Sequence, residues 1–281
     1  MRSEGTVCNL VGVAGNVFLA AIKFLAAAAT GSTALLADAW HSVGDTFQTL
    51  VTAVGFHWGG RPADAEHPYG HGNIETLTAL GVALVLLATG VGVAYEGIRV
   101  LLAGQSSVPG VEALPVACVG VVLKEVLARY SMRVGRRLNS PSILVAAKDH
   151  RADALSSLAA VLGILGARLG LPSLDPAAAV VIGISVLALA APSVRETLSI
   201  LAARAPGGDM ERRIEARFAG DPQVRKVHRI RIQRLGSYYD IDLEIDVDGD
   251  LTVREGHTVA HRVRDAILAA EPFASEVTVH V

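Results

Sequence analysis

The chain has 281 residues, of which 51% are hydrophobic, and its mean hydropathy is +0.43. A chain this apolar lies outside the range of ordinary soluble domains, so we expect an integral membrane protein. The formal net charge is −2 and the basic residues are scattered. This distribution argues against nucleic-acid binding and favours ions as partners.

Six stretches are long and apolar enough to cross a bilayer as helices, which takes about 20 residues each. They run over 6–29, 33–58, 74–102, 108–131, 141–168 and 175–203. The connections 59–73 and 129–140 contain Arg, whereas the other three contain neither Lys nor Arg. By the positive-inside rule, this asymmetry predicts a multi-pass protein of the cell's inner (plasma) membrane with both termini in the cytoplasm.

The second predicted span carries ionisable residues through its middle, among them His41 and Asp45. Such a residue costs roughly 2.5–3.5 kcal/mol at the bilayer centre on insertion scales, so it needs a partner, a cavity or a function. His41 and Asp45 lie four residues apart and share a helical face, and Asp149 and Asp153 repeat this spacing on the fifth span. Two facing pairs supply the four ligands of a tetrahedral site, so we predict a divalent-cation site at these four residues.

The alternative is that the first pair hydrogen-bonds locally while Asp149 pairs with Lys148 or Arg151. Asp38 and His150 neighbour the two pairs, and each either touches the ion or its proton path or is polar packing. One His with three carboxylates is a harder donor set than two His with two carboxylates. It therefore admits Zn(II) and also suits Mn(II) or Fe(II).

Other features of the spans indicate packing. Small residues crowd the first and third spans, as in VGVAGNVFLAA and ALGVALVLLATGVGVA, and allow close helix contact. Five further ionisable residues lie in or near span ends, and we interpret them as snorkelling side chains or interhelical ion pairs. They are Lys23, Glu96, Arg99, Lys124 and Glu125.

The segment RPADAEHPYGHGN before the third span contains a second group of metal-ligand types. Asp64, His67 and His71 are spaced as a local clip, and Pro68 and Gly70 shape the turn. Spacing alone is equally compatible with a solvated loop that binds nothing.

After Pro206 the composition becomes that of a small soluble domain, so we divide the chain into a six-helix transmembrane domain, 1–206, and a cytoplasmic domain, 207–281. The periodicity predicts five elements in the order helix, strand, strand, helix, strand. They cover 209–220, 228–234, 239–247, 252–270 and 276–281. This order predicts an α+β sandwich of one sheet and two helices.

The metal-ligand residues of this domain are far apart in sequence: His228, Asp242, His257, His261 and His280. By strand parity, Asp242 and His280 both face away from the apolar side of their strands and can meet. His228 shares its parity with the apolar residues of its strand, so it reaches that face only if the strand end turns. Ordinary surface histidines are the alternative.

Three motifs, LLADAWHSVGD, PADAEHPYGHGNIETL and AAKDHRADALSS, occur in this order and resemble those of the cation diffusion facilitators, in particular their bacterial divalent-metal/proton antiporters. The resemblance covers essentially the whole chain and implies a ferredoxin-like, metallochaperone-like C-terminal domain. It also implies a homodimer in membrane lipid that exports Zn(II) or a related ion (Mn, Fe, Co or Cd) from the cytoplasm in exchange for protons.

The resemblance assigns site residues in three groups. The transport site comprises His41, Asp45, Asp149 and Asp153. The loop site comprises Asp64, His67 and His71. A binuclear site at the cytoplasmic dimer interface, where metal acts as a regulatory ligand, comprises His228, Asp242, His257 and His280. Asp149 stands where the family's zinc transporters commonly have His, and His41 stands where its iron/zinc branch has Asp, so the choice of metal stays open.

Two other classes of function deserve comparison. An intramembrane metalloenzyme needs an activated water at an open coordination position, but the sequence has no HExxH motif and the four ligands are already assigned, so we expect no enzyme. A membrane metal sensor that binds without transporting fits the C-terminal domain. It leaves the intramembrane pairs unexplained.

Overall fold

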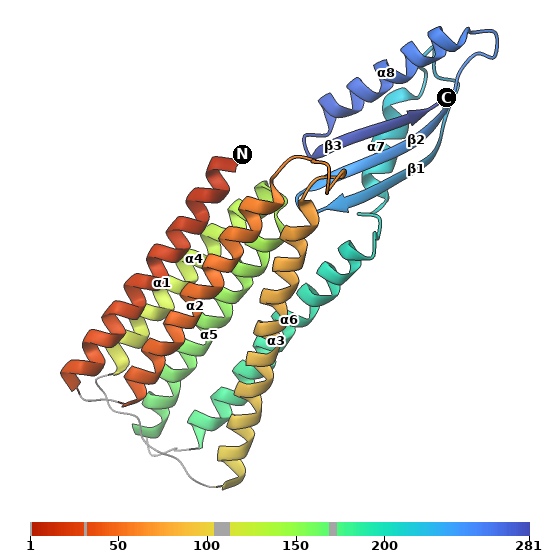
Figure 1. Ribbon diagram of the computed structural model, residues 1–281. Helices are drawn as coiled ribbons and strands as arrows, with labels where there is room; N and C mark the ends of the chain where they lie inside the picture. Colours follow the sequence, from red (N-terminus) through yellow and green to blue (C-terminus); the bar gives the residue numbers. More distant parts are fainter. Residues whose placement is uncertain (1, 31–32, 104–112, 169–172) are drawn as a thin grey trace.

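The computed structural model describes residues 2–30, 33–103, 113–168 and 173–281 (Figure 1). Six long helices come first: α1 (Arg2–Thr30), α2 (Thr33–Gly59), α3 (Gly72–Ala103), α4 (Ala113–Arg137), α5 (Pro141–Arg168) and α6 (Leu174–Leu201). Each predicted span coincides with one of them, so the order and number of the helices are confirmed. The end predicted for the fourth, residue 131, is wrong because hydropathy falls over the arginines that follow, whereas Arg is a good helix former. Its predicted start, 108–112, lies outside the described residues.

The helices form two groups. Helices α1, α2, α4 and α5 lie together, and α3 and α6 lie side by side next to them (Figure 1). A side chain at Gly183 of α6 would overlap the α3 backbone at Ala94, and one at Gly97 of α3 would crowd α6. A side chain at Gly15 of α1 would overlap Leu127 of α4. The predicted close packing through small residues of the first and third helices is thus confirmed.

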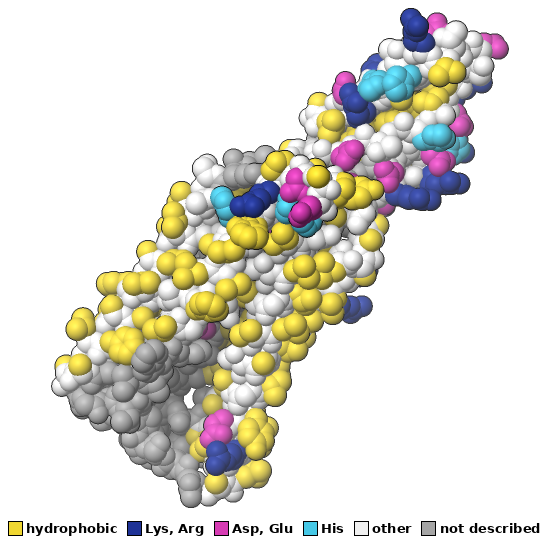
Figure 2. All heavy atoms as spheres, in the orientation of Figure 1, with side chains coloured by type: hydrophobic (Ala, Val, Ile, Leu, Met, Phe, Trp, Pro, Cys, Tyr) yellow, Lys and Arg dark blue, Asp and Glu magenta, His cyan; other side chains and the backbone are white. Residues whose placement is uncertain are grey.

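Three segments of the described helices are long and apolar enough to cross a membrane: Ser3–Ala26, Gly72–Ala103 and Ala179–Leu201. Apolar side chains cover much of the visible surface of the helices (Figure 2), and Leu10 and Phe18 are 61% and 56% exposed. Such a surface suits lipid rather than water. Helices α4 and α5 carry several charged residues in their middle, so the direction in which those side chains point decides whether these helices suit a bilayer.

The C-terminal part contains α7 (Gly208–Phe218), β1 (Lys226–Leu235), β2 (Tyr238–Asp246), α8 (Val253–Ala270) and β3 (Ala274–His280). This order confirms the predicted one. The strands form one sheet in the order β1-β2-β3, with β1 antiparallel and β3 parallel to β2. The parallel pair needs a crossover, and α8 provides it.

Apolar residues on one face of the sheet form the core of this small domain with α7 and α8. Ile241, Leu243 and Ile245 alternate along β2 and contact Val263 and Ile267 of α8, all nearly inaccessible to solvent. The even-numbered residues of β2 lie on the other face, which carries no helix. Helix α8 starts at a capping box, in which the Thr252 and Glu255 side chains satisfy each other's backbone N–H groups.

The two parts meet at the start of α3. The buried carboxylate of Glu75 accepts hydrogen bonds from Ser140 Oγ, from Ser142 Oγ at 3.0 Å and from Ser237 Oγ at 2.7 Å. Ser237 lies in the β1–β2 turn, whereas the other two serines lie at the α4–α5 connection. The Glu75 carboxylate therefore links the β1–β2 turn of the sheet to the start of α3 and to the α4–α5 connection. The turn also packs so closely on α3 that a Cβ at Gly72 would overlap the Leu235 carbonyl.

Replacing Glu75 by Ala should loosen the sheet from the helices. Hydrogen bonds to a charged acceptor contribute about 1.5–3 kcal/mol each, so we expect amide hydrogen exchange over residues 235–238 to accelerate by about tenfold or more. The matched control is Glu215→Ala on the exposed face of α7. Equal protection of the turn in both variants would contradict a role for Glu75 at this junction.

Candidate metal sites

Two acidic residues from different helices converge inside the helical part. Asp45 of α2 and Asp153 of α5 both accept hydrogen bonds from the ammonium group of Lys124 on α4, at 2.8 and 2.6 Å. The Lys124 side chain is 3% exposed, and the carboxylate side chains are 10% and 14% exposed. Charged groups buried to this extent must be paired, and here three helices contribute to one buried ionic cluster.

Asp149 and His150 extend this cluster along α5. One ligand atom of each of Asp149, His150 and Asp153 can be chosen so that all three lie within 4.8 Å of one another. His150 is 1% exposed, and its Nδ1 has no hydrogen-bond partner among the described residues. A buried polar atom without a partner is uncommon, so His150 is a candidate for a neutral ligand or a proton carrier.

The carboxylates line a cavity of about 810 Å³ between the two helix groups. Asp45, Asp149 and Asp153 line it together with Gln48 of α2. Its remaining walls are mostly apolar and come from α2, α3, α5 and α6. A hydrated cation fits this volume, and among the described residues the acidic groups that line it come from the two predicted helices.

Three of the four residues predicted for the transport site are thus brought together. The fourth, His41, lies within α2, but its side chain and that of Asp38 lie outside the described residues. The local alternative for Asp149, pairing with Lys148, does not hold in the structure, because Lys148 donates to Ser193 of α6 at 2.8 Å.

The interpretation of the remaining ionisable residues as ion pairs is confirmed in part. Glu96 and Arg99 pair along α3 rather than between helices, and Glu125 pairs with Arg151 of α5. Lys124 forms interhelical ion pairs, but the expectation that it lies near a span end is wrong. The helix continues to residue 137, which puts Lys124 in the middle of α4.

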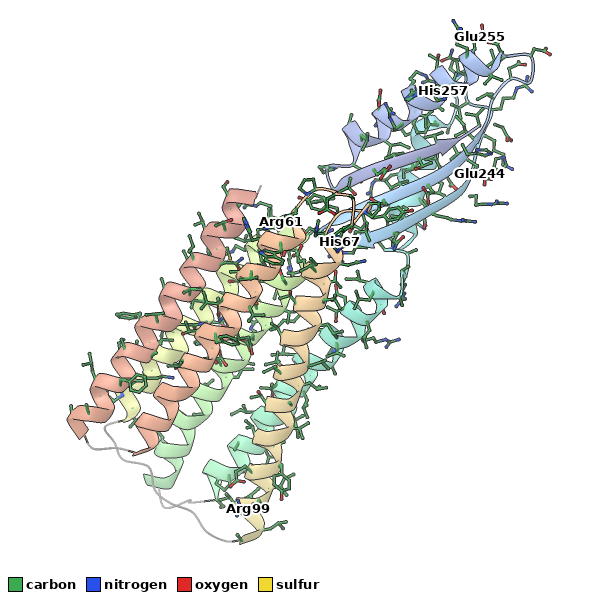
Figure 3. The ribbon with its side chains drawn as sticks, viewed as in Figure 1. Arg61, His67, Arg99, Glu244, Glu255 and His257 are labelled. Carbon is green, nitrogen blue, oxygen red and sulfur yellow. The ribbon has the colours of Figure 1, made fainter. Side chains whose placement is uncertain are left out.

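The loop between α2 and α3 gathers the three residues predicted there (Figure 3). Asp64 lies 3.4 Å from His67 Nδ1 through one oxygen and 3.3 Å from His71 Nε2 through the other. His71 Nδ1 lies 3.2 Å from the carbonyl oxygen of Pro62, so a proton on Nδ1 leaves Nε2 free as a ligand atom. Gly70 has a φ of +80°, which closes the turn between the two histidines.

Asp64 is also prepared for a cation by its backbone contacts. The N–H groups of His67 and Glu66 donate to its carboxylate at 2.8 and 3.0 Å. The His67 hydrogen bond is the main reason that the pKa of Asp64 is lowered from its usual value. The carboxylate therefore stays ionised through neutral and mildly acidic pH and protonates only as the pH falls through this lowered pKa.

The structure does not gather the four residues predicted for the cytoplasmic site within one protomer. His257 lies on α8 (Figure 3), where its Nε2 is 2.8 Å from that of His261. Asp242 lies instead on the exposed face of β2. Register places His228 and His280 on either side of Glu244, on β1 and β3. His228, Glu244 and His280 therefore lie side by side on this face of the sheet and are its candidate metal ligands.

A β-bulge explains how His228 reaches that face. The β1–β2 register shifts between His228 and Arg231, and Arg229 has a φ of 42°. The extra residue moves the side chain of His228 from the apolar face of the sheet to the opposite face. This is the turn of the strand end that the prediction for His228 required. His228 Nε2 lies 2.6 Å from Asp246, a neighbour on the same face. Glu244 is absent from the predicted site because no sequence spacing relates it to a histidine; strand register reveals the row.

Comparisons with known proteins show which family the chain belongs to. The family model "Cation efflux transmembrane domain" matches residues 10–202, and "Cation efflux protein, cytoplasmic domain" matches residues 206–281. Magnetosome protein MamB of Magnetospira sp. is 36% identical over 254 residues, covering 90% of this chain and 86% of MamB. The manganese efflux system protein MneP of Bacillus subtilis is 29% identical over 282 residues, covering 98% of this chain and 92% of MneP.

A plant relative matches as well. Metal tolerance protein C1 of Arabidopsis thaliana is 34% identical over 294 residues, which cover 99% of this chain but only 62% of the plant protein. The two bacterial relatives, in contrast, are matched over most of their length. The chain therefore belongs to the cation diffusion facilitator family, whose members are metal-cation transporters.

Proposed function

We propose that the protein exports a divalent transition-metal cation from the cytoplasm in exchange for protons. The observation that carries this proposal is the meeting of Asp45, Asp149 and Asp153 at one cavity of about 810 Å³ inside apolar helices. Buried carboxylates on two helices have no structural need for one another, because like charges repel. Together they suit a cation that enters and leaves through the cavity.

Zn(II) is the first candidate, with Mn(II) and Fe(II) next and Co(II) and Cd(II) as further ions. Carboxylate oxygens favour the harder metals, whereas a histidine such as His41 or His150 favours Zn(II). The relatives include a manganese efflux protein and a metal tolerance protein. A transported ion must also leave the site, which a set of oxygen ligands permits more readily than a set of thiolates.

Proton coupling follows from the ligand chemistry. Carboxylate and imidazole ligands bind a metal only when deprotonated, so protons and metal compete for the same atoms. Protons that bind from the outside release the metal, and metal that binds from the cytoplasm releases the protons. This exchange needs no acid/base step on a substrate, which is why we propose a transporter and not an enzyme.

We further propose that all six helices span the cell's inner (plasma) membrane, with both termini cytoplasmic and the domain boundary at 206/207. The burial of Lys124, Asp149 and His150 supports this arrangement, because these three polar groups of α4 and α5 would be costly in lipid and point inward. We assign residues 207–281 to the ferredoxin-like, metallochaperone-like class and to a homodimer interface. The matched family model describes a cytoplasmic domain of this kind.

The loop and cytoplasmic sites are then regulatory. In this proposal Asp64, His67 and His71 take up cytoplasmic metal beside the small domain, and the residues on the open face of the sheet bind metal between two protomers. Glu244 joins His228 and His280 there as a ligand. The competing function, a sensor that binds metal without transporting it, predicts metal binding in liposomes without ion or proton flux.

Asp153→Asn should abolish transport. The substitution keeps the side-chain volume but removes a charged ligand, so we expect Zn(II) uptake into inverted proteoliposomes, followed with an internal metal dye, to fall about a hundredfold or more. Glu96→Gln on α3 is the matched control, since its exposed carboxylate pairs with Arg99 on the same helix and Glu96 does not line the cavity. Flux retained by Asp153→Asn would overturn the proposed transport site.

His67→Ala should remove the loop site alone. We expect the purified protein to lose one equivalent of bound Zn(II) in equilibrium dialysis, because a clip of three ligands loses one. Flux at saturating metal should persist, since the loop lies outside the cavity. The control is His57→Ala at the exposed end of α2. Unchanged stoichiometry in His67→Ala would show that the loop binds no metal.

A further inference from the structure

Lys124 stands where a cation would be expected. Its ammonium group lies 2.8 Å from Asp45 Oδ2 and 2.6 Å from Asp153 Oδ2, and so contacts proposed metal ligands on both α2 and α5. The group is buried in the middle of α4.

The negative charges at this position must be neutralised, by protons or by a cation of the chain, whenever the metal is absent. Asp45, Asp149 and Asp153 line one cavity, and their negative charges repel one another in a low-dielectric surrounding. A transporter releases its metal in every cycle, so the carboxylates need another partner afterwards. Lys124 is a cation that the chain itself holds at the site.

We propose that the Lys124 ammonium group occupies the cation position between Asp45 and Asp153 when no metal is bound, and that an incoming divalent cation binds by displacing it. This inference rests on the proposed function, because it takes these carboxylates to be the transport ligands. It makes Lys124 a positioning and specificity-determining residue rather than a ligand.

The need to displace the Lys124 ammonium group would select divalent over monovalent cations. A monovalent cation offers the carboxylates no more charge than the ammonium group does, whereas a divalent transition metal offers twice the charge and directed bonds. Return of the ammonium group would in turn help to expel the metal. The neighbourhood leaves room for such a movement: one turn before Lys124, Gly120 carries no side chain and faces the Ser157 hydroxyl of α5, an acceptor for the withdrawn ammonium group.

The test compares Lys124→Met with Lys148→Met in the full-length protein. Lys148 is the matched control because it also lies inside the helical part but contacts Ser193 and Glu196 of α6 instead of the cavity carboxylates. In Lys124→Met we expect the Zn(II) site that depends on Asp153 to bind about tenfold tighter, since its competitor is gone. Maximal Zn(II) flux should fall about tenfold, since release is slower. Lys148→Met should match the wild type in both.

Loss of stability offers a second readout. Without metal, Lys124→Met leaves the carboxylates uncompensated and should unfold at a lower temperature than the wild type; Zn(II) should restore the melting temperature by replacing the lost cation. Lys124→Arg, which keeps the charge, should need no such rescue. A Lys124→Met protein that Zn(II) fails to rescue, or that binds Zn(II) no more tightly than the wild type, would overturn the proposal and leave Lys124 a structural residue.

The two proposals fail differently. If the transport site is wrong, Asp153→Asn keeps its Zn(II) flux and the Lys124 proposal falls with it. If only the Lys124 proposal is wrong, Asp153→Asn still abolishes flux while Lys124→Met has unchanged or weaker Zn(II) affinity.

Discussion

The main constraint on the helical part is that it must hold together three carboxylates that repel one another. Asp45, Asp149 and Asp153 line one cavity between the helices, and their charges must be neutralised for this arrangement to be stable. The chain meets the requirement by bringing α4 against α2 and α5 so that the ammonium group of Lys124 reaches two of them. Metal, protons and Lys124 are then three alternative partners of the same oxygens.

The division of the helices into two groups gives this cluster its cavity. The carboxylates come from the group that contains α2 and α5, whereas α3 and α6 form much of the apolar wall. Glycines let α3 and α6 approach each other closely, so these two helices form one tightly packed pair beside the other four. Motion of one group against the other is the natural way to change access to the cavity.

The cytoplasmic sheet is joined to both groups. Glu75 at the start of α3 holds Ser140 and Ser142 beside α5 and Ser237 of the sheet. The loop site lies at the same end of the molecule, and a pocket of about 330 Å³ there is lined by His71 and by Asp240 and Glu276 of the sheet. Metal bound at the loop would therefore act next to the contact that sets the position of the small domain.

The helices, the strand order and the candidate ligands Asp45, Asp149 and Asp153 could be predicted from the sequence, because each follows from a local pattern. Spacing by four residues on a helix puts Asp149 beside Asp153 whatever the tertiary packing. The prediction that Lys124 forms an interhelical ion pair is confirmed. Its contact with Asp45 and Asp153 could not be predicted, because no pattern within α4 shows which residues of other helices it contacts. Glu244 required strand register and a bulge, which depend on contacts between strands.

The most direct test of this account is an experimental structure of the full chain with Zn(II), located by its anomalous signal. The account predicts a metal peak about 2.0–2.2 Å from carboxylate oxygens of Asp45 and Asp153, with the Lys124 ammonium group withdrawn from both. Metal bound only at the loop or on the sheet, with Lys124 still bridging the two carboxylates at saturating Zn(II), would contradict it.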